Sequence, residues 1–474
     1  MLSRAAVERH ASRVSCWVII NGDVWDLTDY MSKHPGGESI ILKYAGKDAT
    51  EIFKSIHPPG TIEKYIDKSF RKGTVPVESS QMAKKREIGT ILPLQLILNL
   101  DELETAAKNS ITPMGWTYIS SAAEQLISLR NNRQDWSLVT FRPRTLVDVT
   151  NVDTSRRFFG FNSNLPFFIA PTARAKLAHE DGELCLVRGA SKYNIPFCVS
   201  TYSSVEHSEL SHTLSELQQG GMLAFQLYVQ QDKQRTLELI DMAKKSGFKA
   251  LAITIDTAVL GKREEDEKYQ ATIAYEQGID EYPQSAVSQQ SDDQPVPVWP
   301  HSTSLSWNDI GWLMKAWGKE NGPVYLKGIQ CAEDAHRALK SGVQGIYLSN
   351  HGGRQVDSGA SSLMTLLEIR KFCPEVFGKL EIIMDGGLRR GGDILKAIAL
   401  GATAVGMGRP FLFALGAYGT DGVYRAIQLL SEEIERTMRL IGVTNLNQLN
   451  PSYVNTEILQ ARLPQSLPDL SSKL

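Results

Sequence analysis

The sequence has little net charge, few cysteines and no long apolar run. Its 474 residues carry 51 Lys and Arg against 53 Asp and Glu, a formal net charge of −2. This balance argues against a role driven by binding to nucleic acid or to a membrane surface. No apolar stretch approaches the roughly 20 residues that cross a bilayer, so we expect no membrane span. The five cysteines lie far apart, which predicts reduced thiols rather than a zinc site or a disulfide framework.

The composition is that of a folded chain with more than one domain. Hydrophobic residues make up 42% of the sequence and charged residues 22%, which is typical of globular proteins with a sizeable core. Residues 74–87 are polar, lack periodicity and include a proline, as expected of a domain boundary. We therefore predict a small domain at 1–77, a hinge at 78–93, a larger domain at 94–446 and a tail at 447–474.

The small domain begins with a hairpin pattern. The apolar runs 16–20 and 24–27 flank Asn21-Gly22, a dipeptide that favours a two-residue hairpin turn. Two histidines follow, His34 in a His-Pro-Gly-Gly string and His57 directly before a pair of prolines. As purely structural residues, His34 would belong to a turn and His57 to the surface.

This first segment resembles the α+β haem-binding domain of cytochrome b5. The resemblance implies that His34 and His57 ligate the iron of haem b. Two imidazoles fill both axial positions of the iron and leave none for oxygen or a substrate. Such a haem transfers single electrons.

The larger domain shows a repeated alternation of short apolar runs, loops and amphipathic segments. Eight such units predict an α/β fold, the (β/α)8 or TIM barrel. The active site of that fold lies at the carboxyl ends of the strands, so the polar residues that follow the runs belong together. The predicted strands are 166–173, 195–201, 223–229, 250–257, 323–329, 345–351, 380–387 and 404–410.

The most informative stretch is Ser349-Asn350-His351-Gly352-Gly353-Arg354-Gln355, around the end of the sixth predicted strand. Histidine can take or give a proton near neutral pH, and arginine can hold a carboxylate through two parallel hydrogen bonds. A glycine-rich turn with a surface arginine is the structural alternative. The seven-residue string resembles the active-site signature of the FMN-dependent 2-hydroxy-acid dehydrogenases and oxidases. The similarity extends from Leu94 to about Leu446.

That resemblance implies roles for residues at several strand ends. His351 would be the catalytic base, and Asp256 would orient its imidazole and stabilise the charged form. Two arginines would hold the substrate carboxylate, and two tyrosines would donate hydrogen bonds to a carboxylate or hydroxyl oxygen. The residues expected to contact the substrate in this way are Arg354, Arg263, Tyr118 and Tyr228.

The same resemblance implies an FMN site. The loops after the seventh and eighth strands of a barrel commonly hold a phosphate, although tight turns alone would also explain their glycines. Lys327 would lie near flavin N1, where negative charge develops on reduction. The residues expected to bind FMN are Thr172, Ala173, Ser200, Gln226, Thr254, Lys327, Asp385, Gly386, Gly387, Arg389, Gly408 and Arg409.

Three features depart from the family pattern. Arg174 stands where the family usually carries Leu or Met, and we expect it to shift preference from lactate to a larger acid or one with a second carboxylate. Tyr202, in a short loop, falls where the family places a residue that limits the size of the substrate side chain. Ile119 replaces the second of two consecutive tyrosines.

Residues 265–303 form a long polar insert, expected to be a mobile lid or a disordered loop.

The two domains in this order resemble the flavocytochrome b2 family of L-lactate dehydrogenases. The resemblance implies oxidation of an L-2-hydroxy acid, L-lactate first, to the 2-oxo acid through FMN. Electrons would then pass one at a time to haem b and to cytochrome c or a similar acceptor. The alternatives are an oxidase that returns electrons to oxygen, and a haem electron carrier or sensor on an inactive barrel.

Two further expectations concern assembly and location. The folded pattern starts by Cys16, which leaves little room for a removable targeting segment. We therefore expect the cytosol, while the resemblance offers the mitochondrial intermembrane space as the alternative. Tails like 447–474 wrap neighbouring subunits in the family, which predicts a homotetramer.

Overall fold

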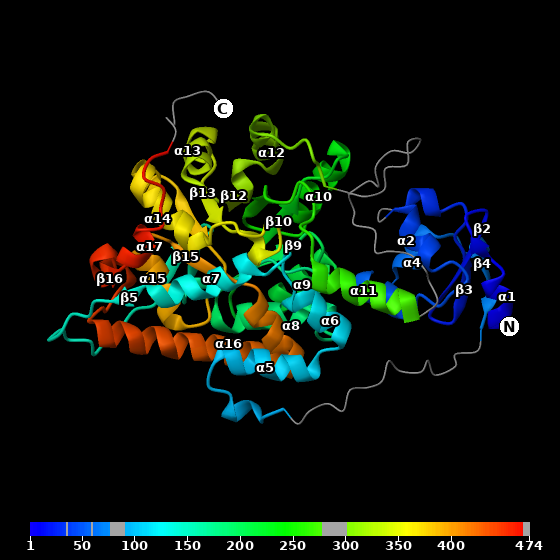
Figure 1. The fold of residues 1–474 in the computed structure, drawn as a ribbon, viewed down its shortest axis with the longest axis horizontal. Helices are drawn as coiled ribbons and strands as arrows, with labels where there is room; N and C mark the ends of the chain where they lie inside the picture. The colour runs from blue at the N-terminus through cyan, green and yellow to red at the C-terminus, as the bar shows by residue number, and fades with distance from the viewer. Residues whose placement is uncertain (35–36, 58–59, 76–90, 277–300, 468–474) are drawn as a thin grey trace. The chain divides into compact units, whose positions relative to one another are not determined.

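The computed structural model describes residues 1–34, 37–57, 60–75, 91–276 and 301–467. These residues form two compact units (Figure 1). The first unit contains the described residues up to 75, and the second contains those from 91 onward. Most of the predicted hinge at 78–93 and most of the predicted insert therefore lie outside the described residues.

The first unit is a four-stranded antiparallel sheet with short helices. The sheet order is β1-β2-β3-β4, and the β2–β3 turn has positive φ at Asn21 (54°) and Gly22 (81°), as the expected hairpin turn requires. The strands are β1 (Ala11–Ser12), β2 (Ser15–Ile20), β3 (Asp23–Asp26) and β4 (Arg71–Thr74). The helices are α1 (Arg4–Glu8), η1 (Met31–Lys33), α2 (Glu38–Lys43), α3 (Thr50–Ile56), α4 (Thr61–Tyr65) and η2 (Lys68–Phe70).

The second unit is a closed barrel of eight parallel strands, and all eight predicted strands are confirmed. They pair in sequence order, and the last strand pairs with the first. Nearly every strand residue is buried, as expected of a parallel sheet covered by helices. The strands are β8 (Phe167–Ile169), β9 (Pro196–Ser200), β10 (Met222–Tyr228), β11 (Leu251–Thr254), β12 (Val324–Ile329), β13 (Gly345–Leu348), β14 (Glu381–Met384) and β15 (Ala404–Met407).

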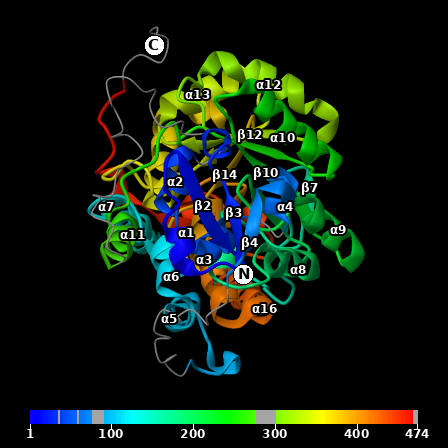
Figure 2. The ribbon, with the colours of Figure 1, turned by 90° about the vertical axis from the view of Figure 1, so that its right-hand side faces the viewer.

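Helices surround the barrel, as Figure 2 shows for α8, α9, α10, α12 and α13. The helices of this unit are α5 (Leu100–Ser110), α6 (Pro113–Ser120), α7 (Ile127–Leu138), α8 (Glu183–Tyr193), α9 (His207–Leu217), α10 (Lys233–Lys245), α11 (Glu264–Glu276), α12 (Ile310–Trp317), α13 (Ala332–Ser341), α14 (Ser362–Phe372), α15 (Gly391–Ala399), α16 (Arg409–Ile441) and α17 (Glu457–Gln460). Short 3-10 turns are η3 (Leu94–Leu96), η4 (Ala175–Leu177), η5 (Trp307–Asp309), η6 (Lys319–Asn321), η7 (His351–Gly353), η8 (Pro374–Val376), η9 (Leu446–Gln448) and η10 (Pro451–Tyr453). None of the described helices is both long and apolar enough to cross a membrane.

Aromatic side chains form a second core inside the barrel. Phe159 packs edge-on against Phe168 and Tyr325, with ring centroids 5.0 and 4.8 Å away. The hairpin of β6 (Arg156–Phe158) and β7 (Phe161–Ser163) supplies part of this cluster. The barrel interior is therefore solid at this level, and polar chemistry is left to the carboxyl ends of the strands.

Three segments refine the sequence interpretation. The apolar stretch 91–108 predicts a helix from its first residue, but helix α5 begins only at Leu100. The Asn99 side chain accepts a hydrogen bond from the Glu102 amide (3.0 Å) and caps the helix there. The expected mobile insert opens with helix α11, and its residues 277–300 lie outside the described part. The tail contributes β16 (Val454–Asn455), which pairs with β5 (Thr140–Phe141) of the same chain.

The burial of leucine side chains in the barrel predicts how their replacement changes the stability of the protein. We expect Leu326→Ala, at a fully buried position of β12, to lower the free energy of unfolding by about 2–5 kcal/mol, because the change leaves a cavity. The matched control Leu440→Ala, at a side chain of α16 that is 70% exposed, should cost less than about 0.5 kcal/mol. Urea unfolding measures both. Equal losses would contradict the burial pattern.

Candidate active site

A strained turn places His351 at the carboxyl end of β13. The residue has φ of 56°, a backbone conformation that costs a non-glycine residue about 1–3 kcal/mol. Its amide donates a hydrogen bond to Ser349 Oγ (3.0 Å), which helps to hold the turn. A Cβ at Gly353 would lie 2.7 Å from the Leu129 amide nitrogen, so the second glycine of the string is required by close packing against α7.

The His351 imidazole is held from both sides. Its Nδ1 lies 2.9 Å from Asp256 Oδ1 and its Nε2 lies 3.2 Å from the Tyr228 hydroxyl. The Thr257 hydroxyl donates to the same Asp256 oxygen (2.9 Å). The structure thus brings together three of the predicted residues and adds Thr257, which the sequence interpretation did not single out.

The backbone of β12 makes room for Asp256. Gly328 has φ of 110° at a register shift between Lys327 and Ile329. A Cβ at Gly328 would lie 2.6 Å from the Asp256 Cβ. Glycine at this position therefore lets the carboxylate lie directly against the strand.

Burial and charge set the protonation states of this pair. Burial alone would raise the pKa of Asp256, but the positive charges of His351 and Lys327 and hydrogen bonds from His351 and Thr257 outweigh it and hold that pKa at about 2. Burial lowers the pKa of His351, and Lys327 and Arg263 add to that lowering against the opposing effect of Asp256. The pair is therefore a carboxylate beside a neutral imidazole at neutral pH, and the imidazole can accept a proton.

An aromatic column extends from this pair. The rings of His301 and Tyr228 stack at 4.2 Å, and the Tyr202 hydroxyl lies 2.8 Å from His301 Nε2. Burial raises the pKa of Tyr202 to about 12 and lowers that of His301 to about 4. The sequence interpretation missed His301, because it stands at the end of a long polar insert that carries no strand or helix pattern of its own.

Arginines cluster around Tyr118. The Arg354 guanidinium donates hydrogen bonds to the carbonyls of Tyr118 (2.9 Å) and Ser121 (2.7 Å), and its Cζ lies 5.2 Å from the centre of the Tyr118 ring. The Cζ of Arg174 lies 5.5 Å from the centre of the same ring. The buried Nε of Arg263 has no hydrogen-bond partner among the residues that the structure describes. Of the predicted substrate-binding residues, Arg354, Tyr118 and Arg174 therefore lie together.

Several of the predicted flavin residues form two hydrogen-bonded sets. Gln226 Nε2 donates to Thr254 Oγ1 (2.8 Å), while Lys327 Nζ donates to Ser349 Oγ, which donates on to Asp385 Oδ1 (3.2 and 2.7 Å). Ser349 is a second residue without an individual role in the sequence interpretation. Ala173 is half-buried, and the buried Ser200 accepts a hydrogen bond at its Oγ from the Tyr202 amide (3.1 Å).

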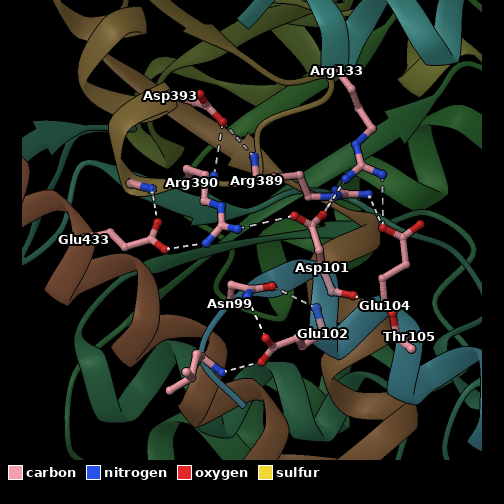
Figure 3. Close-up of polar contacts among 12 residues, drawn as sticks. Asn99, Asp101, Glu102, Glu104, Thr105, Arg133, Arg389, Arg390, Asp393 and Glu433 are labelled. Carbon is pink, nitrogen blue, oxygen red and sulfur yellow. Dashed lines mark hydrogen bonds and ion pairs between the residues drawn. The ribbon is translucent and has the colours of Figure 1, made fainter. Parts of the chain in front are cut away.

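The two arginines expected at the phosphate lie in different surroundings. Arg389 and Arg390 face Asp101 and Glu104 of α5 (Figure 3), with Arg389 Nη2 3.4 Å from Glu104 Oε2. Arg409 instead donates hydrogen bonds to the carbonyls of Ile119, Ser121 and Gly352 at 2.8 to 2.9 Å. Arg409 therefore joins α6 to the glycine-rich turn next to His351.

These residues fit a flavin with a phosphate. Thr172 Oγ1 and Arg389 Nε are buried and have no hydrogen-bond partner within the described ranges, so each has a bond to offer to a ligand. Gly386 and Gly387 have φ of 104° and 78°, and Gly408 is the N-cap of the long helix α16. A helix N-terminus with a neighbouring arginine is a suitable anion site.

The predicted haem ligands face one another in the first unit. The ring centroids of His34 and His57 lie 6.0 Å apart, a separation that suits one metal ion between them. The Nδ1 of His34 lies 3.2 Å from the Gly37 carbonyl, and the Nδ1 of His57 lies 3.3 Å from the Phe53 carbonyl. A hydrogen bond at Nδ1 fixes the tautomer in which Nε2 is the metal ligand. Burial also lowers the pKa of His34, which favours the neutral, ligating form.

Fold and site together define a flavin barrel joined to a haem domain, and comparison with known proteins agrees. The FMN-dependent dehydrogenase family matches residues 107–456, and the cytochrome b5-like haem/steroid binding domain matches residues 3–76. L-lactate dehydrogenase (cytochrome) of Wickerhamomyces anomalus is 38% identical to this chain, covering 97% of it and 81% of that protein. Glycolate oxidase of Spinacia oleracea is 37% identical, covering 76% of this chain and 95% of that protein.

Solved structures of related enzymes are also similar to this chain in fold and in sequence. A flavocytochrome b2 mutant with pyruvate bound has a TM-score of 0.69 at 35% identity, covering 80% of this chain and 91% of that one. A mandelate oxidase mutant with (S)-mandelic acid has a TM-score of 0.64 at 33% identity, covering 76% of this chain and 98% of that one. The chain belongs to the FMN-dependent dehydrogenase family. It is an oxidoreductase with FMN as the cofactor of its barrel and haem b as that of its cytochrome b5-like domain.

The geometry of His351 predicts the effect of replacing it. His351→Gln should slow flavin reduction by substrate about 10²- to 10⁴-fold, the usual contribution of a general base, and leave flavin content unchanged. Anaerobic stopped-flow absorbance measures the rate. His212→Gln, at an exposed histidine of α9 that pairs with Glu216, is the matched control and should have no effect. A rate within threefold of the unmodified protein would show that His351 is not the base.

The lowered pKa of His351 predicts the pH dependence. The base form predominates above that pKa, so kcat/KM should fall as the pH drops through a value below the ordinary 6.5 of histidine. A pH series of kcat/KM measures the acidic limb. A limb at or above 6.5, or the same limb in His351→Gln, would contradict the assignment.

Proposed function

We propose that this protein oxidises an L-2-hydroxy acid to the 2-oxo acid, with L-lactate as the first substrate to test. The observation that carries the proposal is the His351–Asp256 pair at the barrel rim, next to a second rim residue, Arg354. An oriented neutral imidazole beside a guanidinium suits a substrate that has both a carboxylate and a hydroxyl group on the next carbon, from which either the carbon-bound or the hydroxyl proton can be removed.

Different side chains bind the substrate and accept its proton. Arg354 and Arg263 hold the substrate carboxylate, and Tyr118 and Tyr228 donate hydrogen bonds to its oxygens. His351 accepts a proton at Nε2, because Nδ1 is occupied by Asp256. Asp256 is a positioning residue that stabilises the imidazolium once it forms. Bound FMN would supply the two-electron oxidation of the substrate, and haem b held by His34 and His57 would supply single-electron transfer to an acceptor.

Electron transfer to haem is favoured over transfer to oxygen. The glycolate oxidase match leaves out a quarter of this chain, whereas the two matches to L-lactate dehydrogenase (cytochrome) cover 97% of it. The b5-like domain has a histidine pair placed for a six-coordinate haem, which suits electron transfer rather than oxygen binding. An inactive barrel is disfavoured, since His351, Asp256, Arg354 and Lys327 all occupy one rim.

The acceptor and the assembly belong to the same proposal. Cytochrome c, or a carrier like it, is the expected acceptor, since two similar proteins are L-lactate dehydrogenases of the cytochrome type. A homotetramer remains a prediction, which light scattering measures. The cytosol is the proposed compartment, and the mitochondrial intermembrane space is the alternative that fractionation would detect.

An anaerobic absorbance titration tests the function. The protein loaded with FMN and haem b is mixed with a panel of L-2-hydroxy acids, and the flavin and haem bands are recorded together. Flavin bleaching followed by haem reduction, and then reduction of added cytochrome c, supports the proposal. Absence of bleaching by every acid in the panel would overturn it. Peroxide release in air without cytochrome c reduction would favour an oxidase.

The haem ligands make a separate prediction. His34→Ala should remove the haem absorbance band and cytochrome c reduction while substrate still bleaches the flavin, because the barrel has its own core. The control His10→Gln changes a histidine that stacks on Trp17 and should retain haem. Loss of flavin bleaching in His34→Ala, or retention of a normal haem band, would contradict the assignment.

A further inference from the structure

Arg174 is an uncommitted cation in the active site. No hydrogen bond or ion pair of its guanidinium to any described residue is present, although the residue is half-buried. The backbone of Arg174 makes two hydrogen bonds: its amide donates to the Tyr202 carbonyl (3.1 Å), and its carbonyl accepts from the Leu177 amide (3.0 Å). A guanidinium without such a partner is available to pair with an anionic ligand.

The backbone conformation of Arg174 helps to fix the position of this residue. The residue has φ of 58° and ψ of 44°, the left-handed backbone conformation that residues other than glycine rarely adopt. It lies in the loop that follows β8 and stands directly before the turn η4. Strain of this kind clusters at functional sites, where the surrounding structure maintains it.

Two tyrosines connect Arg174 to the reacting centre. On one side its guanidinium lies over the Tyr118 ring, which also lies beneath Arg354. On the other side Tyr202 stacks on Tyr228 at 5.5 Å, and the Tyr228 hydroxyl lies 3.2 Å from His351 Nε2. Arg174 therefore borders the space in which the substrate side chain would extend from the carbon next to His351.

The charges of the site favour a second anion. Arg354 and Arg263 suffice for one carboxylate, and Asp256 is already engaged with His351. Tyr202, whose carbonyl accepts the amide hydrogen bond of Arg174, is joined to His301 by a 2.8 Å hydrogen bond. A phenol, an imidazole and a guanidinium form a polar wall, and such a wall suits a charged substituent better than a methyl or phenyl group.

We propose that Arg174 binds a second carboxylate, so that the preferred substrate is a short-chain L-2-hydroxy dicarboxylic acid rather than L-lactate. This inference rests on the proposed function and names the substrate class of the same site. One carboxylate pairs with Arg354 and Arg263, and the distal carboxylate pairs with Arg174. The oxidation itself is unchanged: the substrate loses two electrons and two protons and becomes the 2-oxo acid.

The test compares L-malate and L-2-hydroxyglutarate with L-lactate on the protein loaded with both cofactors. Flavin bleaching under anaerobic conditions gives kcat and KM for each acid. The unmodified protein should prefer one of the diacids to L-lactate by at least tenfold in kcat/KM. In Arg174→Leu the diacid-to-lactate ratio should fall by about 10- to 100-fold, as expected for loss of a charge-assisted hydrogen bond.

Two further variants separate specificity from structural damage. The loss in Arg174→Leu should lie mainly in KM, since the distal contact is made in both the ground and transition states, and Arg174→Lys should restore part of the ratio. Arg157→Leu, at an exposed arginine of β6 outside the site, is the matched control and should leave the ratio unchanged. A diacid-to-lactate ratio that Arg174→Leu does not alter would overturn the inference, as would bleaching by L-lactate alone. Absence of bleaching by every acid would instead refute the proposed function.

Discussion

The site depends on keeping one carboxylate charged inside the barrel. Asp256 has a side chain that is 1% exposed, and a buried charge is costly unless hydrogen bonds and an opposite charge offset the lost hydration. Here the offset comes from His351, Thr257 and Lys327, which lie on or next to strands β11, β12 and β13. Parallel pairing brings the carboxyl ends of these neighbouring strands together, so the fold and the base are parts of one arrangement.

The same rim carries an excess of positive charge. Lys327, Arg263, Arg354 and Arg174 surround a site whose committed carboxylates are Asp256 and Asp385. Several of the buried polar atoms lack partners within the described chain, including Thr172 Oγ1 and Arg263 Nε. The positive charge of such a site is not balanced unless anions bind, which fits a flavin phosphate and a carboxylic acid as its ligands.

Much of this arrangement follows from the sequence, because apolar runs mark the strands and a parallel barrel gathers their carboxyl ends. That logic predicted all eight strands and placed His351 beside Asp256. It did not predict His301, which reaches the site through an insert without periodicity, or Thr257, whose role depends on a side-chain rotamer. The start of α5 was also misplaced, since Asn99 caps the helix although the apolar pattern begins several residues earlier. Polar residues that act through tertiary contacts leave no periodic signal.

The central claim is that Asp256 and His351 act as one unit. A double-mutant cycle of Asp256→Asn, His351→Gln and the combined variant, read as the rate of flavin reduction, tests this claim directly. We expect strong non-additivity, with the double variant no slower than His351→Gln alone, because the carboxylate acts only through the imidazole. Rate losses that multiply would show two independent roles and would contradict it.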